Sequence, residues 1–101
     1  MVRRYYVHKP DNQISSGTSV LTRIIWSLAC DCYAGTLMDM DEVNDAVLTL
    51  RSRALEEKRR TYNSHPIEIM VIKADSEGRY MWCIGSAMLM LEPVREAKGV
   101  L

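Results

Sequence analysis

The strongest constraint on the fold is a stripe of apolar residues at helical spacing over residues 20–33. Apolar side chains recur there every three or four positions, which places them on one face of an α-helix. Trp26 and Cys30 widen that face. We therefore expect the helix to be mostly buried, or buried on one side by the fold and on another by a partner. Gly35 is a natural end point, because glycine adopts the left-handed backbone conformation at little cost.

A second helix is predicted to begin at Asp39 or Asp41, each of which can cap a helix. Apolar residues then recur with spacings of three and four from position 43 to position 54. Acidic residues crowd the start of this segment and basic residues its end, an arrangement that the helix dipole favours. The stripe stops after Leu55, so we expect the rest of the helix, Glu57 included, to be exposed to solvent.

Three segments are predicted to be β-strands. Residues 3–8 alternate polar and large side chains, residues 67–73 are rich in Ile, Met and Val, and residues 79–84 alternate again. The turn-forming residues 74–78 lie between the last two, so these strands are predicted to form a hairpin.

The segment after Gly85 allows two interpretations. Ser86 can cap a short helix over residues 87–91, which we favour, or the same residues can prolong the strand past a bulge at Gly85. Residues 94–101 are expected to fray or to dock on a partner.

These elements predict an α+β fold in a single domain of residues 1–101. We expect a small antiparallel sheet of about three strands with two helices packed on one face. The predicted order is β-α-α-β-β plus a short C-terminal element. Because an exposed sheet face and its edges need protection, a homodimer is one expected assembly.

Charge and composition exclude several classes of protein. The chain has 13 basic and 13 acidic residues and 48% apolar residues, which argues against disorder and against a strongly basic nucleic-acid binder. The zero net charge is, however, a cancellation along the second helix, acidic over 39–45 and basic over 51–60. Neither a long apolar run nor a signal-peptide pattern occurs, so we expect a cytoplasmic protein with no membrane partner.

Metal and catalytic sites are not predicted. Cys30 and Cys32 point about 200° apart on a helix and cannot hold one ion together, so the cysteines are expected to be free thiols. The chain has two histidines, His8 and His65. The sequence contains no nucleophile elbow, phosphate-binding loop or dinucleotide-binding motif. We therefore expect no enzyme and no cofactor. A small enzyme that uses His65 or Cys83 remains a minor hypothesis.

The basic end of the second helix is the most polarised stretch. A solvated helix end is the simplest interpretation of Arg51, Arg53, Arg59 and Arg60. The functional alternative is a patch that binds phosphates or an acidic protein surface. A weak nucleic-acid-binding module at this helix end is thus an alternative function.

The C-terminal third holds a surplus of Met and Trp, either as core or as an apolar interface. The sequence therefore favours a non-enzymatic regulator or inhibitor that acts by binding another protein, of the kind that phages and mobile elements encode. The predicted partner-binding residues are Trp26, Arg51, Arg53, Arg59, Arg60, Trp82, Met88 and Met90.

Overall fold

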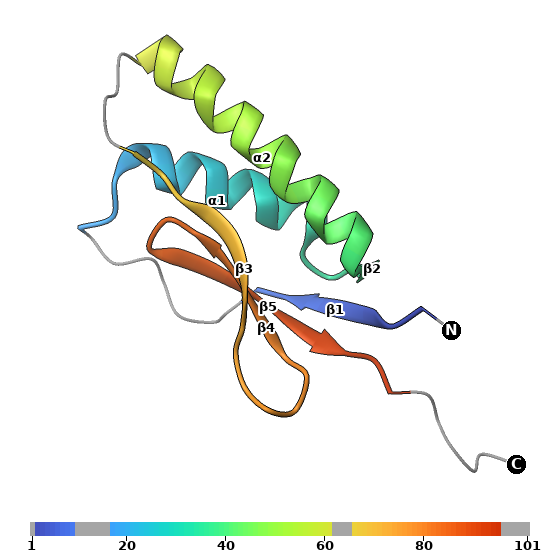
Figure 1. Cartoon of the computed structure of the whole chain (residues 1–101). Coiled ribbons are helices and arrows are strands. Elements are labelled where there is room, and N and C mark those ends of the chain that lie inside the picture. The colour runs from blue at the N-terminus through green and yellow to red at the C-terminus, as the bar shows by residue number, and fades with distance from the viewer. Residues whose placement is uncertain (1, 10–16, 62–65, 96–101) are drawn as a thin grey trace, which may run out of the picture.

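The protein is an α+β sandwich of one sheet and one helical layer. The computed structural model describes residues 2–9, 17–61 and 66–95. In these residues the elements are β1 (Arg4–His8), α1 (Val20–Tyr33), β2 (Leu37–Asp39), α2 (Met40–Thr61), β3 (Ile69–Lys73), β4 (Tyr80–Ile84) and β5 (Ala87–Pro93). The five strands form one antiparallel sheet in the order β2-β1-β5-β4-β3, and both helices lie on the same side of it (Figure 1). The predicted fold class is confirmed.

The described sheet has five strands, so the predicted number of about three is wrong, as is the predicted order of elements. Residues 87–91 are part of β5, and the short helix that we favoured there does not form. The reason is a tight turn at Gly85 and Ser86. Ile84 pairs directly with Ala87, and Gly85 has a φ of 58°, so the chain reverses and β5 returns along β4 without a bulge.

β2 is the other strand that the sequence pattern does not reveal. Its central residue, Met38, pairs with Tyr5 of β1, so tertiary contact holds this short segment extended. α2 follows at once, and Asp39 caps it as predicted. The Asp39 carboxylate accepts a hydrogen bond from the Glu42 N–H at 2.8 Å, and the Glu42 carboxylate accepts one from the Asp39 N–H at 3.0 Å. This reciprocal pair is a capping box.

The core lies between the helices and the inner face of the sheet. Strand alternation directs every second side chain of β1, β4 and β5 towards the helices. Trp82 is the largest side chain that is fully buried there, and its ring lies 5.2 Å from that of Tyr33 on α1. The other fully buried large side chains are Val7, Leu21, Ile25, Val43, Leu50, Ile84, Leu89 and Leu91.

Glu57 corrects the expectation that α2 is solvated after Leu55. Its side chain is buried, and its carboxylate lies 3.7 Å from the Arg53 Nε and 3.4 Å from the Arg60 Nη1. Both arginines are largely exposed, so each ion pair is worth at most about 1 kcal/mol. The charged end of α2 is therefore partly neutralised within the helix itself.

The turn between β4 and β5 allows a stability prediction. A Cβ atom at Gly85 would lie 2.7 Å from the Thr22 Oγ1 of α1, whereas one at Gly35 would meet nothing closer than the Tyr6 hydroxyl at 3.8 Å. Both glycines have positive φ, so both alanine variants carry similar backbone strain. We expect Gly85→Ala to lower the free energy of unfolding by at least about 1 kcal/mol more than Gly35→Ala, because of the added overpacking. Urea denaturation measures this, and equal losses would contradict the described packing against Thr22.

Candidate partner-binding site

The face of the sheet turned away from the helices carries an unbroken cluster of apolar side chains. Alternation places on this face the residues that lie between the core positions of β3, β4 and β5. In the register, one cross-strand row runs from Met70 through Cys83 to Met88, and the next runs from Ile72 through Met81 to Met90. We call these side chains the open-face cluster: Met70, Ile72, Met81, Cys83, Met88 and Met90.

Methionines dominate this cluster. It holds four of the seven methionines of the chain. Among the described methionines, only Met38 belongs to the buried core. All six cluster members are partly exposed, and Ile72 reaches 41%. The methionine surplus is therefore mostly a property of a surface, and both described helices lie on the opposite side of the sheet (Figure 1).

Two further exposed apolar side chains lie on this face towards β2, beyond the polar residues His8 and Glu92. Tyr6 of β1 pairs with Leu37 of β2, and both side chains are exposed. Tyr6 also packs edge-on against His8, with ring centroids 4.5 Å apart, and His8 pairs with Met90 of the cluster. Strand pairing thus connects Tyr6 and Leu37 to the open-face cluster through His8.

Charged residues border one end of this face. The Arg79 Nε lies 2.6 Å from the Asp75 Oδ2 and 3.9 Å from the Glu92 Oε2. Desolvation raises the pKa of Asp75, but hydrogen bonds from the Arg79 side chain and from the Glu77 and Arg79 amides outweigh it and hold this pKa below its usual value. The carboxylate thus stays charged and paired with Arg79 at neutral pH, which gives the apolar face a polar rim.

The predicted residues Met88 and Met90 both lie in the open-face cluster. Trp82 does not belong to a binding surface: it is 0% exposed, because alternation turns it inwards while Met81 and Cys83 turn outwards. Trp26 is partly buried on α1, where its indole N–H donates to the Met88 carbonyl at 2.9 Å and the Lys9 Nζ lies 5.4 Å from its ring centre. This hydrogen bond links α1 to β5, so Trp26 has a structural role.

The predicted basic residues do not form one patch. The Arg51 side chain donates two hydrogen bonds, of 3.0 and 2.7 Å, to the Ile69 carbonyl at the edge of the sheet. Arg53 and Arg60 instead flank Glu57, and Arg59 points into solvent. The four arginines therefore lie in three different environments along α2 and do not combine into one basic surface.

Cysteine placement agrees with the helical spacing, since Cys30 is buried and Cys32 is exposed. Burial raises the pKa of the Cys83 thiol above its ordinary value, which makes it a weak nucleophile at neutral pH.

Within residues 2–9, 17–61 and 66–95 no group of three potential metal ligands occurs, and no helix is long and apolar enough to cross a membrane. His65 lies outside the described residues.

The predicted partner-binding residues do not include Met70, Ile72, Met81 and Cys83 of this surface, although Met81 belongs to the Met- and Trp-rich C-terminal third. The alternation along residues 79–84 is visible in the sequence, but it does not show which side of the sheet the helices cover.

Comparison with known proteins assigns neither a family nor a function, because no family model, curated protein or solved structure matches this chain.

Thiol reactivity tests this placement. We expect iodoacetamide at pH 8 to modify Cys32 first, because it is exposed, and Cys83 and Cys30 more slowly, because burial raises the pKa of both thiols. Mass spectrometry of peptides over a time course measures the order. Modification of Cys30 as fast as Cys32 would contradict the described orientation of α1.

Proposed function

We propose that this protein is a non-enzymatic regulator or inhibitor that acts by binding another protein through the open-face cluster. One observation carries the proposal: six apolar side chains from three adjacent strands form a continuous surface that no described element covers. Exposed apolar patches of this kind mark protein interfaces.

The size of the cluster suits the centre of such an interface. Each position on one face of a sheet occupies about 33 Å², so six positions span about 200 Å². Burial of that area contributes about 5 kcal/mol before the costs of association are subtracted. A typical interface buries about 800 Å² on each partner. Tyr6, Leu37 and the charged rim around Arg79 would supply part of the remaining contact.

The chemistry of the cluster favours a protein as the ligand. Methionine side chains are flexible and polarisable, so they adapt to the shape of a partner surface. The basic residues of α2, by contrast, diverge and are partly neutralised, which offers phosphates no concentrated charge. We therefore prefer a protein partner to the alternative of a nucleic acid.

Charge substitutions on the open face test the proposal. We expect Met81→Glu and Met90→Glu to abolish retention of a partner that the wild-type protein retains from an extract of its native cells, because a buried carboxylate is costly. Leu48→Glu is the matched control, since Leu48 is 59% exposed on α2 and lies in the helical layer. Quantitative mass spectrometry of the retained proteins and light scattering of the purified protein are the measurements.

The outcomes separate clearly. A protein that wild type and Leu48→Glu retain and both methionine variants lose supports the proposal, whereas a homodimer that occupies the open face and leaves no retained partner would contradict it. Partners or self-association unaffected by both methionine variants, or a strictly monomeric protein that retains nothing, would contradict it. Circular dichroism confirms that each variant is folded.

A further inference from the structure

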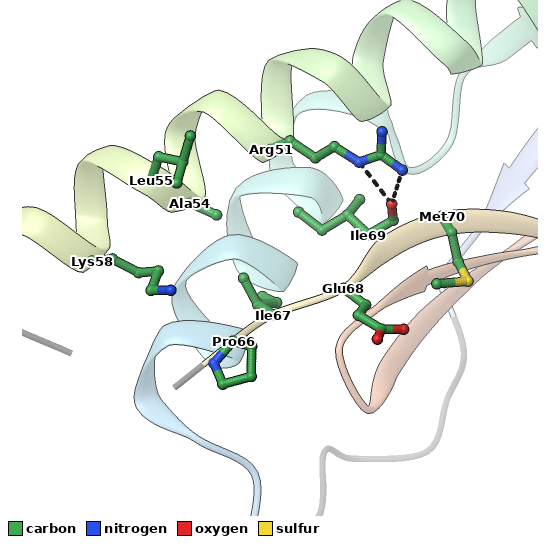
Figure 2. Close-up of a pocket in the computed structure, with 9 residues that line it drawn as sticks. All are labelled: Arg51, Ala54, Leu55, Lys58, Pro66, Ile67, Glu68, Ile69 and Met70. Atoms are coloured by element: carbon green, nitrogen blue, oxygen red, sulfur yellow. Dashed lines mark hydrogen bonds between the residues drawn. The ribbon is translucent and has the colours of Figure 1, made fainter. Parts of the chain in front are cut away.

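A groove of about 410 Å³ lies between α2 and the edge of the sheet. Arg51, Ala54, Leu55 and Lys58 line it from the helix, and residues 66–70 line it from the strand side (Figure 2). Leu55 is 55% exposed on the helical wall, which gives the groove an apolar contact surface. The groove is separate from the open-face cluster, apart from Met70 at its end.

The strand side of the groove ends at Ile69 and Met70, the first two residues of β3, and the free edge of β3 continues from there to Val71. β3 is the last strand of the sheet and pairs only with β4 among the described strands. The Glu68 carbonyl accepts a hydrogen bond from the Gly85 N–H at 2.7 Å, so the backbone groups of even-numbered residues face β4. Those of Ile69 and Val71 therefore face away from the sheet, as unpaired edge groups do.

The Arg51 side chain already demonstrates how this edge binds a donor. Its Nε and Nη2 both donate to the Ile69 carbonyl, in the place where the N–H of an added strand would donate (Figure 2). One accepting group of the edge is thereby occupied, while the backbone groups of Val71 have no such cover from the described side chains. The edge of β3 is therefore covered at the Ile69 carbonyl and unpaired at Val71.

The helical wall of the groove is positively charged and lacks acidic partners. Among the described residues neither Arg51 nor Lys58 forms an ion pair, since Arg51 binds a neutral carbonyl. Glu68 is the acidic residue of the lining, and its carboxylate lies on the other side of the strand from both cations (Figure 2). An occupant with a carboxylate facing α2 would therefore complement this wall.

We propose that the groove binds an extended peptide segment of another protein, with an acidic side chain directed at Arg51 and Lys58. Its backbone would add a strand to the edge of β3 at Val71, and an apolar side chain would pack on Leu55. Strand addition supplies affinity through main-chain hydrogen bonds, and the groove supplies selectivity for the side chains. Arg51 would exchange the Ile69 carbonyl for the stronger charge-assisted bond to a carboxylate.

Selection from a displayed library of random linear peptides of about seven residues, the length of a common strand, tests this proposal. We expect the enriched peptides to carry Asp or Glu among β-branched residues. Fluorescence anisotropy should show their affinity falling at least about fivefold for Lys58→Gln and for Arg51→Gln, because each variant removes one attractive charge. Arg59→Gln is the matched control, since Arg59 is an exposed cation of the same helix outside the groove. Its affinity for the peptides should be unchanged.

N-methylation of single peptide amides distinguishes strand addition from binding by side chains alone. Methyl groups on alternate amides should abolish binding, and those on the intervening amides should leave it intact, because only every second amide faces β3. Amide NMR shifts should map to residues 66–71 and to residues 51–58 of α2, and the amides of Met81, Met88 and Met90 should not shift. The proposal is overturned if no peptide is enriched, if the enriched peptides bind Lys58→Gln and Arg51→Gln as tightly as wild type, or if the shifts map to Met81, Met88 and Met90 of the open-face cluster. Because the surfaces differ, that last result would leave the first proposal standing.

Discussion

The register of the β4–β5 hairpin decides what faces the core and what faces outwards. Trp82 pairs with Leu89 on the inner side, and Met81 pairs with Met90 on the outer side. A slip of one residue would exchange these sets, exposing the indole of Trp82 and burying methionines beneath the helices. The two-residue turn at Gly85 prevents the slip, because it fixes which residues of the two strands stand opposite one another. The core and the open face are thus two consequences of one turn.

The two described helices cover one face of the sheet, and no described element covers the other (Figure 1). A sheet of five strands is about 24 Å wide. Two helices side by side, each about 10 Å in diameter, cover most of that width in a single layer. α1 and α2 therefore suffice for one face of the described sheet and leave the other without a layer (Figure 1). A sheet with a solvated face normally alternates apolar and polar residues. Here the outward positions of β3, β4 and β5 are mainly methionines, which argues for a second layer supplied by another chain.

Local patterns predicted both helices, the cap at Asp39, the first strand and the hairpin of β3 and β4. They failed where tertiary contact overrides local preference. Residues 87–91 are Ala, Met and Leu, which are strong helix formers, yet the turn at Gly85 commits them to β5. β2 is too short for periodicity to show, and it exists because β1 lies beside it.

The site was predictable only in part for a similar reason. Met88 and Met90 were identified from composition, whereas Trp82 was misplaced because a surplus of large apolar residues does not reveal which of them face inwards. The neighbours Met70, Ile72 and Met81 join them through strand register, which requires the fold. The hydrogen bonds from Arg51 to the Ile69 carbonyl join α2 to β3, and no sequence pattern predicts them.

Methionine oxidation measures most directly whether another protein covers the open face. Hydrogen peroxide converts accessible methionines to sulfoxides, which mass spectrometry assigns residue by residue. In the purified protein we expect Met81 and Met90 to oxidise faster than the buried Met38. In an extract of the native cells they should become protected, while Met40 on α2, partly exposed outside the cluster, keeps its rate relative to Met38. Unchanged oxidation rates of Met81 and Met90 relative to Met40 would contradict a partner on this face.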